Sequence, residues 1–179
     1  MKAKRLAAAA VAATATNTTG CATNDIHQYV ENDSPRLVLE EYFLGKTTAY
    51  GVFEDRFGKV RRTFKVDILG TVENNQLTLT EDFRYNDGEI DQRIWVIDIM
   101  GDGNYRGTAG DVPGYAIGKT VGNTFNWKYK VNLSVDGKIW KVGFDDWMYL
   151  LEDDILLNRA YVTRYGVRIG EVTISFQKP

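Results

Sequence analysis

Cysteine and histidine each occur once in this chain, as Cys21 and His27. One residue of each type provides neither a disulfide framework nor a Cys/His zinc cluster. The 17 glycines form no phosphate-binding loop, and no Gly-x-Ser-x-Gly motif is present. Asp102 and Asn104 lack the further oxygen ligands of a calcium loop. We therefore expect no metal site, no cofactor and no nucleophilic catalytic residue. His27 lies in a polar segment without partners, so we do not expect it to act as a ligand or base.

The sequence also lacks an apolar run of the roughly 20 residues that a membrane-spanning helix needs. The weakly apolar residues 6–15 follow three basic residues and are typical of a secretory signal peptide. The signal ends at Gly20-Cys21, and this pair resembles a bacterial lipobox, in which the thiol is acylated after cleavage. Thr18 stands where Leu is usual, so an ordinary cleavage site beside a free thiol is the alternative. Acylation is favoured because an exported protein enters an oxidising compartment.

Positive charge is scarce once the signal is removed. The chain has 22 Lys and Arg against 24 Asp and Glu, and the signal contains three of the basic residues, which leaves 19 and a net charge of −5. This balance argues against nucleic acid and anionic lipid as electrostatic partners. Membrane attachment must then come from an acylated Cys21. Ala22, in place of a retention Asp, predicts an outer-membrane lipoprotein that faces the periplasm.

Helical periodicity is absent outside the signal, and apolar residues alternate with a period of two. Alternating segments recur about every 8 to 12 residues, at 47–54, 60–69, both arms of 77–99, 105–109, 115–119, both sides of Asp136-Gly137, 156–164 and 167–176. We predict an all-β fold, a lipocalin-like antiparallel meander barrel of roughly 8 to 10 strands with a cavity for one small ligand. A β-sandwich is the alternative. The predicted organisation is a signal peptide at 1–21, a polar tether at 22–36 and one barrel domain at 37–179 that begins with a short plug.

The hairpin at 77–99 organises this prediction, because its register decides which charged residues face the core. A two-residue turn would pair Asp82 with Arg93 on a wet outer face. A three-residue turn that ends in a Gly bulge instead pairs Glu81 with Arg93 and puts both on the apolar face beside Trp95. We favour the second register because it gathers the apolar residues of the second strand on one side. It predicts an ion pair between Glu81 and Arg93 inside an apolar face.

Other hairpins bring further charged residues toward the core. A tight Asp-Gly turn pairs Trp127 with Asp146 and so places Asp146 on the buried face. In the last hairpin Asn158 and Arg159 lie on opposite faces, so one of them must point inward. Arg62 falls on the apolar side of its strand, close to a turn.

Burying these charges costs several kcal/mol each unless they are paired, and three interpretations follow. In the first, arginines receive a carboxylate or phosphate head group while aromatic residues line a slot for an apolar chain. The predicted binding residues are Arg93, Glu81, Trp95, Asp146, Arg159, Trp127 and Arg62. In the second, the network only holds one end of a packed barrel together. In the third, Glu81 and Asp146 form the acid and base pair of a hydrolase, but we predict no catalytic residue, because partnership with inward arginines explains both carboxylates.

Several motifs carry a resemblance to a known group. They are Phe43-x-Gly45, Gly58-x-Val60-Arg61-Arg62-x-Phe64, Glu81-x-Phe83-x-Tyr85-x-Asp87-Gly88-Glu89 with Arg93-x-Trp95, Gly122-Asn123, Asp145-Asp146-Trp147-Met148-Tyr149 and Asn158-Arg159-Ala160. The chain resembles an uncharacterised family of Gram-negative bacterial lipoproteins with a domain of unknown function. The resemblance implies a lipocalin-like envelope lipoprotein with a link to membrane-lipid modification. We expect a non-enzymatic lipoprotein that binds or carries a small amphipathic ligand such as a fatty acid or lipid. A structural or interaction lipoprotein with a packed barrel is the alternative.

Overall fold

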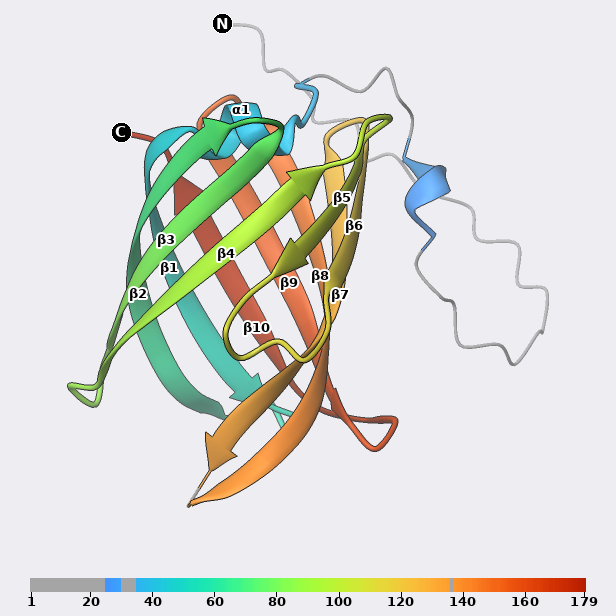
Figure 1. Cartoon of the computed structure of the whole chain (residues 1–179). Coiled ribbons are helices and arrows are strands. Elements are labelled where there is room, and N and C mark those ends of the chain that lie inside the picture. Colours follow the sequence, from blue (N-terminus) through green and yellow to red (C-terminus); the bar gives the residue numbers. More distant parts are fainter. Residues whose placement is uncertain (1–24, 30–34, 136) are drawn as a thin grey trace, which may run out of the picture.

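A computed structural model describes residues 25–29, 35–135 and 137–179. Ten described strands follow one another along the chain and form a closed antiparallel barrel (Figure 1). The strands are β1 (Gly45–Asp55), β2 (Val60–Glu73), β3 (Gln76–Tyr85), β4 (Ile90–Ile99), β5 (Asn104–Thr108), β6 (Ala116–Val121), β7 (Thr124–Val135), β8 (Lys138–Glu152), β9 (Ile155–Arg164) and β10 (Val167–Gln177). The described helices are the 3-10 turn η1 (Ile26–Gln28) and the short α1 (Leu39–Phe43).

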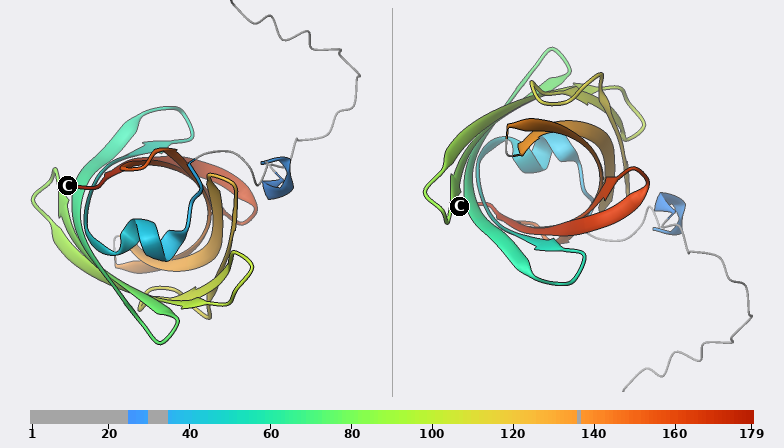
Figure 2. Two further views of the ribbon diagram at one scale, coloured as in Figure 1. Left: turned by 90° about the horizontal axis from the view of Figure 1, so that it is seen from above. Right: turned by 90° about the horizontal axis from the view of Figure 1, so that it is seen from below.

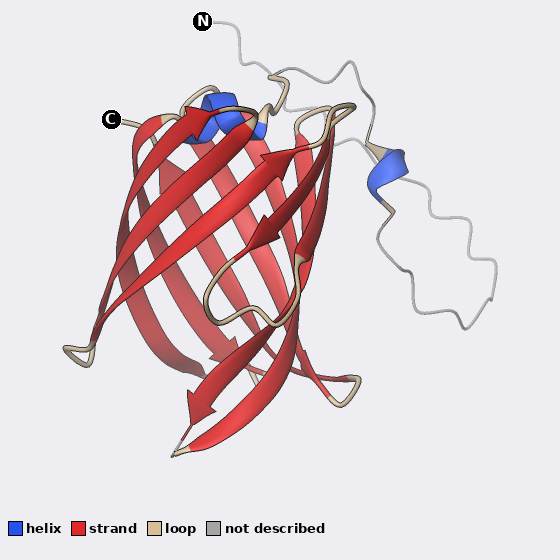
Figure 3. Cartoon of the chain, viewed as in Figure 1, coloured by secondary structure: helices blue, strands red, loops and turns tan. Residues whose placement is uncertain are grey.

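Each strand pairs with its neighbours in sequence, and β1 pairs with β10 to close the sheet. This ladder runs from Thr48 opposite Gln177 to Asp55 opposite Gly170. The closure confirms the predicted antiparallel meander barrel and excludes the sandwich, which would leave two separate sheets. Figure 3 shows that nearly all of the described chain is strand. Ten strands lie at the upper end of the predicted range.

The β3–β4 hairpin has the three-residue turn that the sequence favoured. The Tyr85 N–H donates to the Glu89 carbonyl at 3.0 Å, and Gly88 has a φ of 87°, which a residue with a side chain rarely adopts. Glu81 therefore lies opposite Arg93. The predicted register is confirmed, and with it the inward direction of both side chains.

The other predicted pairings are confirmed in part. Trp127 pairs with Asp146 across β7 and β8, and Asp146 is buried. In β9, Asn158 is the inward residue and is 2% exposed, whereas Arg159 points outward to Glu171. The prediction that Arg159 supports the site is therefore wrong, because the alternation along β9 gives the inward position to its neighbour.

The predicted plug is the helix α1, which lies across one end of the barrel (Figure 2). Leu39 and Phe43 are buried there. The barrel wall approaches the plug very closely at Gly70, where a Cβ would lie 1.9 Å from the Phe43 carbonyl oxygen. Glycine is therefore required at this point of β2. We call this the plugged end, and the end that carries the 86–88 turn the far end.

Two strands are shorter than their neighbours. Within the described barrel, β5 pairs with β4 only from Val96 to Ile99, and β6 pairs with β7 only as far as Lys128. Residues 109–115 form a loop that crosses the space between the remaining parts of β4 and β7 (Figure 1). The loop is held to β7 by the Asn132 N–H, which donates to the Asp111 carbonyl at 2.9 Å. This segment, which we call the side loop, completes the wall toward the far end.

Part of the predicted tether packs on the outside of the barrel. Tyr29 contacts the rings of Trp147 and Tyr149, and its hydroxyl lies 3.2 Å from that of Tyr149. The predicted signal peptide and Cys21 lie outside the described residues. In the described residues, no helix has both the length and the apolar character needed to cross a bilayer.

Candidate functional site

The barrel encloses a cavity of about 230 Å³ that runs from the plug toward the far end. Its wall is mainly apolar and is built from α1 and from every strand except β5 and β6. The aromatic residues of the wall are Phe43, Phe64, Phe83, Tyr85, Trp95, Phe125, Trp127, Tyr129, Phe144 and Phe176. The predicted aromatic residues Trp95 and Trp127 are both in this wall. Their rings pack edge to face with centroids 5.5 Å apart.

A small set of polar side chains reaches this cavity. They are Glu81, Asp91, Arg93, Asp146 and Asn158, besides the Tyr85 and Tyr129 hydroxyls. Five of the seven predicted binding residues therefore line one cavity: Glu81, Arg93, Asp146, Trp95 and Trp127. The antiparallel barrel does this by bringing β3 and β4 to face β7, β8 and β9 across one lumen.

Asp146 lies deepest among the carboxylates and is 4% exposed. Its Oδ1 accepts a hydrogen bond from Asn158 Nδ2 at 2.7 Å, and the Tyr129 hydroxyl donates to the same carboxylate, while the Asn158 Oδ1 is buried without a hydrogen-bond partner. Burial raises the pKa of Asp146 from 3.8 to about 6, although Asn158, Tyr129 and Arg93 favour the charged form. The site thus keeps a carboxylate that has only neutral hydrogen-bond donors, and beside it an unsatisfied amide oxygen, in a mainly apolar wall.

Glu81 faces the same cavity. Burial raises its pKa from 4.5 to about 7, Arg93 opposes this rise, and Asp111 and Asp146 add to it. Although Glu81 and Arg93 are opposite in register, they form no ion pair of salt-bridge length among the described contacts. The predicted ion pair between these two residues is therefore wrong.

Arg93 binds the side loop instead, because its Nη2 donates to Asp111 Oδ2. Burial disfavours the charged guanidinium, but Tyr129, Glu81 and Asp111 together raise the pKa of Arg93 above its ordinary value. Both members of the pair are about a quarter to a third exposed. Arg93 thus holds the side loop against the barrel by its ion pair with Asp111. Its positive charge also favours the ionised forms of Glu81 and Asp146.

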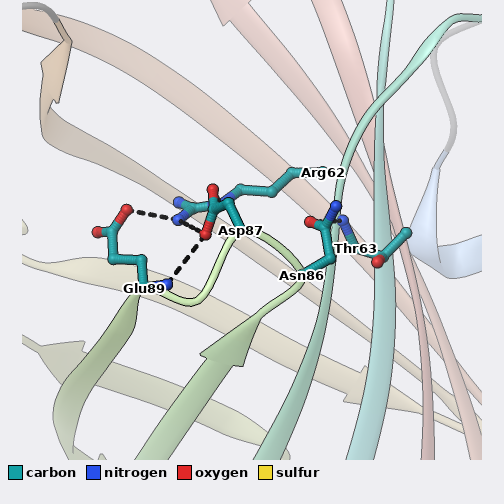
Figure 4. A network of polar contacts seen from close by, with 5 residues as sticks. All are labelled: Arg62, Thr63, Asn86, Asp87 and Glu89. Carbon is teal, nitrogen blue, oxygen red and sulfur yellow. Dashed lines mark hydrogen bonds and ion pairs between the residues drawn. The ribbon is translucent and has the colours of Figure 1, made fainter.

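Arg62 lies at the far end and does not line the cavity. Its guanidinium is stacked on the Tyr85 ring, with 3.5 Å from Cζ to the ring centroid. Asp87 of the 86–88 turn and Glu89, the residue after it, hold the guanidinium by ion pairs (Figure 4). The Glu89 N–H also donates to Asp87 Oδ1 at 3.1 Å. Arg62 is on the predicted face of its strand. Its guanidinium is paired with Asp87 and Glu89, however, and is not available to a ligand in the cavity.

Sequence reasoning did not identify two residues of the site, Asp111 and Asn158. Asp111 comes from a loop, where alternation predicts no direction. The sequence did not decide whether Asn158 or Arg159 points inward. The signal that favoured Asn158 was the pair of apolar residues two positions before and after it in β9, Leu156 and Ala160.

A family model described as a protein of unknown function, DUF3833, matches residues 15–178. A search of curated proteins finds no match.

Solved structures show the same fold in distant proteins. A crystal structure of a protein of unknown function of the DUF3598 family from Nostoc punctiforme is similar with a TM-score of 0.59 and 12% identity. That similarity covers 80% of this chain and 50% of the Nostoc protein, so this chain spans about half of that protein's length. The S-type phycobiliprotein lyase CpeS from Guillardia theta is similar with a TM-score of 0.55 and 7% identity, over 78% of this chain and 90% of the lyase. At these identities the likeness concerns the fold alone.

Proposed function

The chain belongs to the DUF3833 family of proteins of unknown function, and from its lumen we propose that it is a binding protein that carries one small amphipathic molecule inside the barrel. The observation that carries this proposal is a cavity of about 230 Å³ with an aromatic wall, two inward carboxylates and a buried amide oxygen, of Asn158, that has no partner. Ligand sites typically combine a mainly apolar surface with a few polar groups that fix orientation. A packed structural barrel, the alternative, gives no reason for such a space.

The size of the cavity limits the ligand. Typical small-molecule sites have volumes of about 300 to 1,000 Å³, and this cavity, at about 230 Å³, is slightly smaller. A molecule with a short apolar chain and one polar group suits it better than a long fatty acid. The fold likeness to a phycobiliprotein lyase agrees with a barrel that accepts a small molecule. The two proteins are only 7% identical, so the likeness does not identify the ligand of this chain.

In this proposal the protein is not an enzyme. The described wall of the cavity contains no Ser, Cys, His or Lys, and the two buried carboxylates that could act as an acid and base pair are those of Glu81 and Asp146. A hydrolase that used them would cleave chromogenic glycosides and would lose this activity in Glu81→Gln. Absence of turnover in the unaltered protein, together with retained ligand, supports a carrier.

The proposal also includes export and attachment to the outer membrane through an acylated Cys21. Support comes from the basic and apolar sequence before Gly20-Cys21. Labelling with an alkyne analogue of palmitate, followed by membrane fractionation, tests it. Label and outer-membrane recovery are expected for the unaltered protein and not for Cys21→Ser. Equal recovery of both proteins without label would contradict acylation.

Ligand binding is tested by native mass spectrometry of the protein extracted from its membrane. A small molecule is expected to leave with the protein and to be absent from Ala160→Leu, because Ala160 is buried and lines the cavity. Arg159→Leu places the same side chain on the adjacent outward position and serves as the matched control. Both variants are first compared by urea unfolding, so that loss of the fold is distinguished from loss of space. Unaltered protein without any bound molecule, also after incubation with short-chain amphiphiles, would refute the proposal.

A further inference from the structure

The lumen is rich in hydrogen-bond acceptors that are not used. Asn158 Oδ1 is buried without a partner, and Asp146, beside it, has only the neutral donors Asn158 and Tyr129; the two residues are 2% and 4% exposed. The Glu81 carboxylate faces the same space and accepts no hydrogen bond among the described contacts. Unsatisfied buried acceptors cost free energy, typically about 1 to 3 kcal/mol each. A ligand that donates hydrogen bonds would recover this energy.

The donors of the same region are, in contrast, already engaged. The Arg93 guanidinium binds Asp111, and Arg62 binds Asp87 and Glu89. The Asn158 amide and the Tyr129 hydroxyl donate to Asp146. A ligand carboxylate that entered this lumen would therefore find no free cation and would lie close to two other carboxylates.

We propose that the lumen selects ligands by a cationic, hydrogen-bond-donating head, a primary amine on a short apolar chain, with Asp146 and Glu81 as the groups that bind the ammonium. An ammonium has three donors and no acceptor, which complements a pair of carboxylates with an amide oxygen beside them. Hydrogen bonds between charged partners are the strongest of their kind. The aromatic wall around Trp95 and Trp127 receives the chain. This inference rests on the proposed function and specifies its ligand class.

The charges around these groups agree with this assignment. Asp91, Asp111 and the Tyr129 hydroxyl lie on the elements that face Glu81 and Asp146, and Arg93 is the one cation of the described cavity wall. The pKa values of Glu81 and Asp146 are raised for the same reason. Both carboxyl groups are buried with little positive charge nearby, and this disfavours their ionised forms. A bound ammonium supplies the missing positive charge, so binding is expected to strengthen as the pH rises from 5 to 8.

The test is a titration of the full mature protein with three probes of equal chain length, hexylamine, hexanol and hexanoate. Trp95 and Trp127 line the cavity, so tryptophan fluorescence reports on occupancy, and calorimetry provides the affinity. Hexylamine is expected to bind about 10-fold to 100-fold more tightly than hexanoate, as one charge-assisted hydrogen bond predicts. Asp146→Asn and Glu81→Gln should each remove most of this preference.

Asp145→Asn is the matched control. Asp145 is the neighbour of Asp146 in β8 but points outward, to Lys128 and Asn126, so this variant should keep the preference for the amine. Hexanoate or hexanol binding as tightly as hexylamine, or an unchanged preference in both lumen variants, would overturn the inference and leave the proposed carrier intact. Absence of binding by all three probes would contradict the proposed function itself, and the inference with it.

Discussion

The two carboxylates of the lumen predict an unusual dependence of stability on pH. In the folded protein Glu81 has a pKa of about 7 and Asp146 of about 6, against ordinary values of 4.5 and 3.8. Between about pH 4 and 7 the folded protein therefore binds more protons than the unfolded chain. The free energy of unfolding must then fall as the pH rises through this window. Proton uptake stabilises the fold here, whereas most proteins lose stability when carboxylates are protonated.

The magnitude follows from the Glu81 values. At about 1.4 kcal/mol per pKa unit, holding Glu81 ionised in the fold costs about 3 kcal/mol at pH 8 and less than about 1 kcal/mol at pH 5. We expect Glu81→Gln to raise the free energy of unfolding by about 2 to 3 kcal/mol at pH 8 and by little at pH 5. Asp146→Asn should act in the same direction. The two effects should not add fully, because the carboxylates repel each other.

Urea unfolding at pH 5 and pH 8, followed by tryptophan fluorescence, measures this difference. Glu73→Gln is the control, because Glu73 is an exposed acid at the end of β2. The surface acids do not obscure the window. Hydrogen bonds from Arg62 and Gln76 lower the pKa of Asp87 and Asp98, so these groups titrate at more acidic pH. Equal stability of Glu81→Gln and the unaltered protein at pH 8 would refute the account of Glu81 as a buried, poorly compensated charge.

Three further predictions concern the structure around the lumen. Gly70→Ala should lower the free energy of unfolding by about 1 to 3 kcal/mol, because its Cβ would meet the Phe43 carbonyl; urea unfolding measures the loss, and Gly110→Ala, where a Cβ has open space, is the control. Asp111→Ala should lower the free energy of unfolding by about 2 kcal/mol, because it leaves Arg93 without its partner. Amide hydrogen exchange should become faster in residues 109–115. Unchanged exchange would show that the ion pair does not hold the loop. Arg159→Ala should change stability by less than about 1 kcal/mol, because its pair with Glu171 lies on the exposed face, and a larger loss would contradict this placement.

Sequence alternation determined much of this protein. The period of two, the Gly and Asn turns and the apolar faces predicted the barrel, and the bulged turn that ends in Gly88 set Glu81 opposite Arg93. The buried position of Asp146 followed from the tight turn after β7 in the same way. These features are local, because hydrogen bonds between consecutive strands couple the direction of each side chain to that of its neighbours.

The partners of those inward charges were decided only by the tertiary structure. Asp111 reaches Arg93 from a loop that has no alternation, and Arg62 is held by carboxylates of another turn. The closure of β1 on β10 and the cavity that it encloses also depend on all ten strands together. Strand phase determines whether a charge points inward. Its partner depends on which distant segments the closed barrel brings within a few ångströms, and no local pattern contains that information.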